Sequence, residues 1–147
     1  MVKKEVIMYR EISEEMLKFI EKSPSCYHAV DNLAGMLDGY IRLSEEEDWN
    51  LKKGGKYYVV RKDSSIIAFR IPKDDYKAVY ISAAHSDSPT FKVKPNPGME
   101  SAGVYATLNT EKYGGMIMST WFDRPLSVAG RVVYEREGKL ASKNVNI

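Results

Sequence analysis

A histidine and an aspartate two positions apart are the residues in this sequence best suited to chemistry. His85 and Asp87 lie in the stretch AVYISAAHSDSP (78–89), whose apolar first half predicts a buried strand that leads into a loop. In an extended segment, side chains two apart point to the same face. A neutral imidazole is a good zinc ligand, and a nearby carboxylate can fix its tautomer. Ligands of open α/β sheets bind beyond the carboxyl ends of the strands, where this pair would lie. The spacing alone is weak evidence, because a lone histidine near a strand end is more often structural.

Other reactive residues give weaker signals. Cys26 and His28 could form a thiol nucleophile with its base, but residues two apart on a helix point away from each other. One cysteine and two histidines cannot supply zinc-finger spacing. The sequence contains neither a GK[ST] phosphate loop nor a GxGxxG fingerprint, so it gives no support to nucleotide binding.

Two pairs of charged residues have a structural explanation beside a functional one. Lys92 and Lys94 alternate on one strand face, where they could meet an acidic substrate, although a solvated strand edge explains them better. Asp123 and Arg124 could supply a functional carboxylate, but a local ion pair is the preferred interpretation. Neither pair adds a candidate site.

The composition limits the class of protein. The 147 residues are 44% hydrophobic, which is enough for the core of one ordinary domain. The 22 basic and 20 acidic residues leave a net charge of +2, so no electrostatic argument favours nucleic acid or an anionic membrane. A single cysteine, without a secretory or membrane-spanning apolar run, favours a cytoplasmic setting.

The elements expected before the central strand are two helices and a hairpin. We expect an extended start over residues 1–10, then a helix capped by Ser13 that stops before Pro24. A second helix is expected to begin near Ser25, with Gly39 in a left-handed conformation after it. The first helix is expected to bury the apolar stripe Ile12, Met16, Phe19 and Ile20. The strands expected next are a short one at Tyr40–Leu43 and a hairpin of Tyr57–Arg61 with Ser65–Ile71.

The second half of the chain is expected to be rich in strands. Alternation in residues 91–94 predicts a half-buried strand, which Pro95 and Pro97-Gly98 should cut. This cut is the best candidate for a domain boundary. Short strand signals separated by turn glycines continue to the end of the chain, which stops without a polar tail and suggests truncation.

A series of motifs resembles the aspartyl-aminopeptidase family of dinuclear zinc exopeptidases, and the resemblance spans nearly all of residues 11–133. The motifs are YHAV (27–30), WNLKKGGKYYVVR (49–61), SSIIAFRIP (64–72), AAHSDSP (83–89), FKVKP (91–95), LNTEKYGGM (108–116) and STWFDRPLSVAGRVV (119–133). The combination of HSDSP with YGG and TWFDR is specific to this family.

The resemblance implies a metallopeptidase, a hydrolase that removes N-terminal, often acidic, residues from peptides. It implies that His85 is a metal ligand and that Asp87, counted with the catalytic residues, supports this ligand and shapes the site. Two zinc ions would activate a water molecule for attack on the peptide carbonyl. The implied fold is α/β, with residues 1–95 as the first part of a zinc-exopeptidase catalytic domain. Residues 96–147 would begin a β-rich dimerisation domain inserted into it.

The resemblance implies that the remaining zinc ligands and the general base come from segments downstream of residue 147. The sequence therefore looks like the amino-terminal third of an enzyme, inactive alone and stable only as an oligomer or with its missing portion. A peptide substrate is implied, and neither nucleic acid nor a membrane is expected as a partner. Two alternatives stay open, a non-catalytic assembly module that keeps the family scaffold and a metal-free small-molecule binder.

Overall fold

The computed structural model describes residues 2–147, and side chains from Met8 onward. The chain forms two compact units, one made of residues 1–87 and 127–147 and the other of residues 88–126. The domain boundary at residue 95 that the family resemblance implies stays a prediction.

Helix α1 spans Val2–Glu21, so the expectation of an extended start is wrong for the described residues 2–10. The first 20 residues contain no glycine or proline, and helix-favouring Lys, Glu, Met and Arg residues let the helix begin early. Ser13 is therefore not a cap. It lies inside the helix, and its hydroxyl donates a 2.8 Å hydrogen bond to the carbonyl of Tyr9 one turn earlier.

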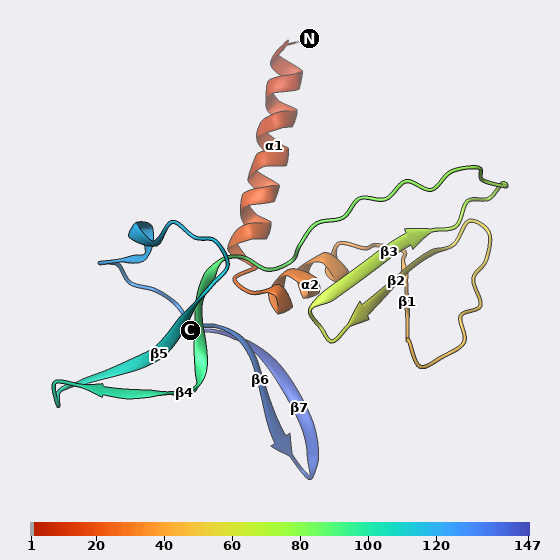
Figure 1. The fold of residues 1–147 in the computed structure, drawn as a ribbon. Helices are drawn as coiled ribbons and strands as arrows, with labels where there is room; N and C mark the ends of the chain where they lie inside the picture. The colour runs from red at the N-terminus through yellow and green to blue at the C-terminus, as the bar shows by residue number, and fades with distance from the viewer. Residues whose placement is uncertain (1) are drawn as a thin grey trace. The chain divides into compact units, whose positions relative to one another are not determined.

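The apolar stripe of α1 is mostly exposed, contrary to expectation. Ile12, Met16 and Ile20 are each more than half exposed, and only Phe19 is half-buried. The reason is that α1 packs against just one other helix of the described chain, near its own C-terminal end (Figure 1).

Helix α2 spans Cys26–Gly35 and begins after an extended Ser25, as predicted. Its residues Ala29 and Val30 are buried and form part of the small core. Gly39 has φ +71°, which is the left-handed conformation expected after the helix.

A three-stranded sheet follows, with β1 (Ile41–Leu43) parallel to β2 (Lys56–Arg61) and β2 antiparallel to β3 (Ser65–Arg70). The predicted hairpin is confirmed. Its turn uses positive φ values at Lys62 (51°) and Asp63 (55°), which match the twist of two antiparallel strands.

The inner face of the sheet carries the buried Tyr57 and Val59. The ring of Tyr57 lies 5.7 Å from that of Phe69, which lies 6.3 Å from that of Trp49. These rings join the hairpin to the loop before it.

The predicted buried central strand at residues 78–84 is not formed. Figure 1 draws the segment between β3 and β4 as a loop, and Val79, Tyr80 and Ile81 are 71%, 96% and 85% exposed. A strand with apolar residues on both faces is stable only when a neighbouring strand pairs with it and other elements cover both faces of the sheet. The described residues supply neither, because the sheet has the order β1-β2-β3 and ends at β3.

The second unit contains β4 (Thr90–Ser101), β5 (Tyr105–Tyr113) and a short 3-10 helix at Met118–Trp121. The predicted cut at residues 95–98 is a shift in register between Val93 and Gly98 rather than the end of a strand. The prolines remove backbone donors without ending the pairing.

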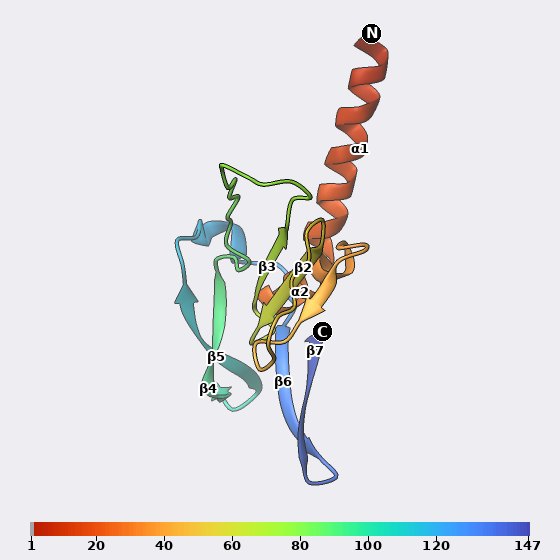
Figure 2. The same ribbon diagram turned by 90° about the vertical axis from the view of Figure 1, so that its right-hand side faces the viewer.

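The last hairpin, β6 (Ala129–Arg136) and β7 (Lys139–Asn146), belongs to the first unit. Asn144 of β7 donates a 2.6 Å hydrogen bond to the carboxylate of Asp31 on α2. Figure 2 shows the two strands of this hairpin side by side. The predicted α/β fold with a strand-rich second half is thus confirmed.

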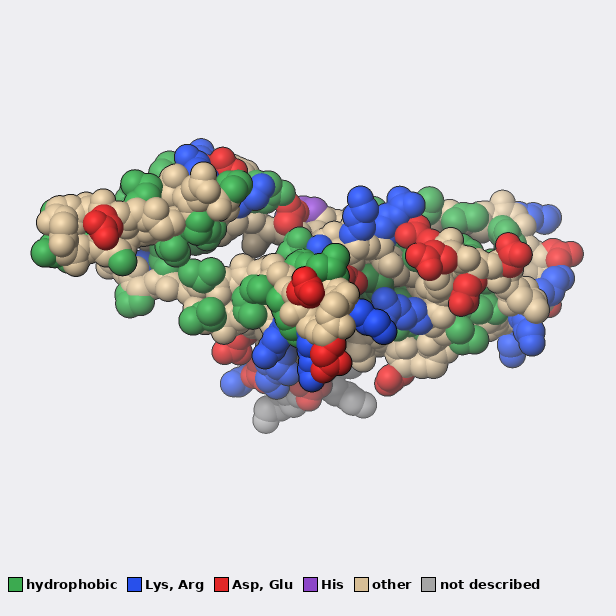
Figure 3. Space-filling model, turned by 90° about the horizontal axis from the view of Figure 1, so that it is seen from below, with side chains coloured by type: hydrophobic (Ala, Val, Ile, Leu, Met, Phe, Trp, Pro, Cys, Tyr) green, Lys and Arg blue, Asp and Glu red, His purple; other side chains and the backbone are tan. Residues whose placement is uncertain are grey.

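Large hydrophobic side chains reach the surface throughout the described chain, and Figure 3 shows many of them on one face. The described part of the chain has no helix that is both long and apolar enough to span a bilayer.

Candidate metal centre

His85 and Asp87 lie together at the end of the exposed segment, as their spacing predicted. The Nδ1 atom of His85 lies 3.1 Å from Oδ1 of Asp87 and 2.7 Å from the backbone carbonyl oxygen of the same residue. The His85 side chain is 79% exposed, so it is not a buried structural histidine. The two side chains converge in a loop rather than on a strand.

These contacts select one tautomer of the imidazole. A backbone carbonyl can only accept a hydrogen bond, so Nδ1 must carry the proton if this bond is to form. The lone pair of the neutral ring is then on Nε2. A protein carboxylate or carbonyl on the far nitrogen is the usual arrangement behind a metal-bound histidine.

The loop that carries the pair is tied to the hairpin turn. Ser86, between the two residues, donates a 2.9 Å hydrogen bond from its hydroxyl to the carbonyl of Ser64. No spacing rule in the sequence predicts this contact, because the two serines are 22 residues apart. Only the place of Ser86 inside the HSDSP motif could have drawn attention to it.

The donor chemistry here fits zinc, but the number of donors is incomplete. Zinc in proteins takes three or four ligands from Cys, His, Asp and Glu side chains. The described residues contain no cluster of three such side chains. The other histidine, His28, has its Nδ1 2.8 Å from the hydroxyl of Ser25 at the start of α2. The residues at hand would therefore supply one imidazole ligand through Nε2 of His85.

The other charged candidates form ordinary surface contacts. Lys92 lies 4.0 Å from Glu111 across the β4–β5 pair, and both side chains are more than half exposed. Arg124 donates a 3.4 Å hydrogen bond to the carbonyl of Thr120. Arg124 and Asp123, which both lie in the described part of the chain, do not form the ion pair that the sequence predicts.

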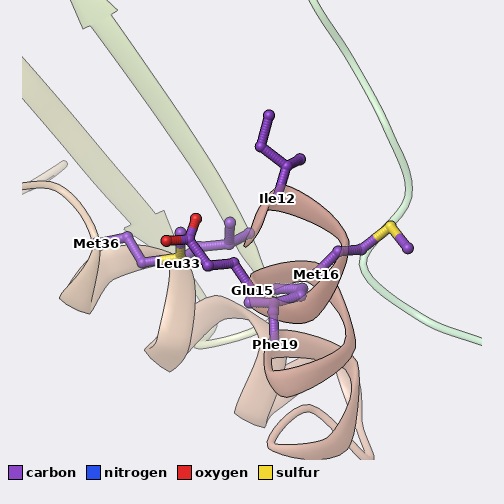
Figure 4. Close-up of a pocket in the computed structure, with 6 residues that line it drawn as sticks. All are labelled: Ile12, Glu15, Met16, Phe19, Leu33 and Met36. Atoms are coloured by element: carbon purple, nitrogen blue, oxygen red, sulfur yellow. The ribbon is translucent and has the colours of Figure 1, made fainter. Parts of the chain in front are cut away.

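An apolar hollow of about 270 Å³ lies between α1 and α2 (Figure 4). It is lined by Ile12, Glu15, Met16, Phe19, Leu33 and Met36. Glu15 is its single charged residue, and Figure 4 shows it extending from α1 toward α2. This lining suits helix packing and holds no group of catalytic residues.

Comparison with protein families finds a match over residues 19–147 to the family described as aminopeptidase I zinc metalloprotease (M18). A probable M18 family aminopeptidase 2 of Clostridium novyi is 47% identical over 146 residues, which cover 93% of this chain and 33% of the relative. A probable M18 family aminopeptidase 2 of Clostridium acetobutylicum is 48% identical over 134 residues, which cover 88% of this chain and 31% of the relative.

Among solved structures, that of Chaetomium thermophilum mApe1 is similar with a TM-score of 0.82 and 32% identity. The match covers 93% of this chain and 33% of that protein. The chain thus spans about a third of the length of the curated relatives it matches.

Proposed function

Since this chain belongs to the aminopeptidase I zinc metalloprotease family (M18), we propose that it forms the amino-terminal part of an aminopeptidase that hydrolyses N-terminal residues from peptides. The support is the family match together with relatives that are named as probable aminopeptidases and are about three times as long. Acidic N-terminal residues as the preferred substrates and a cytoplasmic location are finer parts of the same proposal.

The proposed role of His85 is to bind zinc through Nε2. The single observation that carries this role is the double contact of its Nδ1 with the carbonyl and carboxylate oxygens of Asp87. Asp87 holds the proton at Nδ1 and keeps the ring from turning, so that the lone pair stays on Nε2. Zinc, when bound, supplies the Lewis acid that activates water and polarises the peptide carbonyl.

The full site is proposed to hold two zinc ions, with its other ligands and its general base outside this chain. The described residues bring together too few donors for even one complete zinc site. We therefore expect the isolated chain to be inactive. Residues 1–95 are proposed to belong to the catalytic domain and residues 96–147 to a dimerisation domain.

The exposed segment at residues 78–84 supports the proposal that the chain works only as part of an assembly. Val79, Tyr80 and Ile81 would form a buried strand if a partner supplied the missing neighbours, and exposed apolar segments of this kind promote association. A second copy of the chain or the remainder of the same polypeptide would satisfy this need.

Zinc calorimetry on the full-length protein tests the proposal. Replacement of His85 by alanine should abolish tight binding at this site and peptide cleavage with it. His28→Ala is the matched control, because this histidine contacts Ser25 and should leave both properties nearly unchanged. If His85→Ala changes neither property, the non-catalytic assembly module becomes the better account. Ligand binding that persists in excess chelator would favour the metal-free binder.

A further inference from the structure

We propose that Ser86 is a positioning residue, which fixes the His85–Asp87 loop to the β2–β3 turn so that Nε2 of His85 points to the metal. We further infer that Arg131, from the distant β6 strand, holds this turn in place. The inference rests on the proposed function, because it concerns how the zinc ligand is held.

The loop needs an anchor because the ligand histidine is largely exposed. His85 contacts Asp87 two residues further along the same loop. No strand is formed between β3 and β4 in the described chain, and the strand proposed for residues 78–84 of the complete protein would end before His85. Sheet hydrogen bonds would therefore not hold residues 85–87 themselves. The hydroxyl of Ser86 donates a 2.9 Å, partly buried hydrogen bond to a residue outside the loop, at the carbonyl of Ser64.

The receiving end of this bond is a constrained turn. Lys62 and Asp63 both have positive φ, and the amide of Ser64 donates a 3.2 Å hydrogen bond to the carbonyl of Arg61. The strands on either side of the turn are paired along their whole length. The carbonyl of Ser64 is therefore a firm attachment point.

Arg131 binds the same turn from another part of the chain. Its Nη1 atom lies 2.8 Å from Oδ2 of Asp63 and 3.2 Å from the carbonyl oxygen of Lys62. Its guanidinium carbon lies 4.5 Å from the centre of the Tyr27 ring on α2. The Arg131 side chain is 25% exposed and that of Asp63 is 50% exposed, so the arginine is the better shielded partner of this ion pair.

The contacts form a continuous series from α2 to the candidate ligand. Tyr27 packs on Arg131, Arg131 holds the turn, and the turn accepts the hydrogen bond of Ser86. A zinc ligand held within a small range of orientations binds more tightly than a mobile one, and residues behind a ligand commonly change metal affinity by 10- to 100-fold. We expect the loss of the Ser86 hydroxyl to weaken zinc binding by about tenfold, the low end of that range.

The experiment compares Ser86→Ala with Ser86→Thr in the full-length protein. Zinc affinity is measured by competition with a chelator, and the visible spectrum of Co²⁺ in the same site reports ligand geometry. Ser86→Ala should weaken zinc binding about tenfold and shift the Co²⁺ bands, whereas threonine keeps the hydroxyl and should restore both. Ser142→Ala on the exposed part of β7 is the control for loss of a serine hydroxyl. Thermal unfolding identifies any variant that does not fold.

The possible outcomes separate this inference from the proposed function. If His85→Ala abolishes zinc binding and Ser86→Ala matches the original protein in affinity and spectrum, the anchor is overturned and the function stands. If Ser86→Thr folds but shows the same loss of zinc affinity and the same shift of the Co²⁺ bands as Ser86→Ala, the hydroxyl is not the anchor. If His85→Ala leaves zinc binding unchanged, the proposed ligand and its positioning residue are both overturned.

Discussion

The Nδ1 atom of His85 lies 2.7 Å from the backbone carbonyl oxygen of Asp87 and 3.1 Å from the carboxylate oxygen of the same residue. One residue thus offers the imidazole two acceptors, one from its main chain and one from its side chain. The main-chain acceptor survives any substitution at this position. The side-chain acceptor can therefore be tested separately.

Replacement of Asp87 by alanine should weaken zinc binding to the full-length protein by 10- to 100-fold without abolishing it. The carbonyl of residue 87 still selects the tautomer of His85, but the carboxylate that also accepts from Nδ1 and helps to hold the ring is lost. Chelator competition measures the change. Asp87→Asn keeps an oxygen acceptor, so its zinc affinity should lie between that of the original protein and that of the alanine variant. A zinc affinity below that of the alanine variant would contradict this explanation.

Replacement of Gly55 by alanine should destabilise the chain by about 1–3 kcal/mol. A methyl group at this position would collide with the ring and hydroxyl of Tyr57, which is buried and accepts a 2.9 Å hydrogen bond from the amide of Lys52. Urea unfolding of the full-length protein measures the loss. Gly35→Ala is the control, because nothing lies within 4 Å of a methyl group there. Equal stability of the two variants would show that the Tyr57 ring moves aside.

Replacement of Arg131 by alanine should destabilise the protein by about 1–2 kcal/mol, because it removes hydrogen bonds to Lys62 and Asp63 and the packing on Tyr27. Arg136→Ala is the matched control. The Arg136 side chain is 74% exposed and its ion pair is 3.8 Å long, so its loss should change stability by less than about 0.5 kcal/mol. Urea midpoints that shift equally for both variants would argue against a specific role of Arg131.

The isolated 147-residue chain should associate through its exposed apolar segment. Lysines in place of Val79 and Ile81, which are 71% and 85% exposed, should reduce the associated fraction by charge repulsion and loss of apolar surface. Size-exclusion chromatography with light scattering measures this fraction. Ser82→Lys adds charge without removing apolar surface and serves as the control. A monodisperse monomer with cooperative melting from the unaltered chain would contradict the expectation.

The sequence predicted those parts of the fold that depend on local signals. Local turn signals predict the hairpin turn at residues 63–65, and the structure forms it at residues 62–64. The second helix is predicted to begin near Ser25, and it begins at Cys26, although the Ser25 side chain makes no capping hydrogen bond. The pairing of His85 with Asp87 is also local, since any chain path that keeps the two side chains on one face brings them together.

Features that depend on distant parts of the chain could not be predicted in this way. The burial expected for Ile81 and Met16 requires other elements to cover them, and in the described chain both are exposed. The contacts of Ser86 with Ser64 and of Arg131 with Asp63 join residues 22 and 68 positions apart. Such contacts follow from the way the elements pack, and no spacing rule within the sequence indicates them.

The most direct test is a crystal structure of the full-length protein with zinc, with anomalous diffraction data collected at the zinc absorption edge. We expect an anomalous peak about 2.0–2.1 Å from Nε2 of His85, the usual length of a zinc–histidine bond, with Nδ1 still facing Asp87. Zinc peaks that leave Nε2 of His85 without a bond, or that lie on its Nδ1, would contradict the assignment of His85 as the zinc ligand held by Asp87.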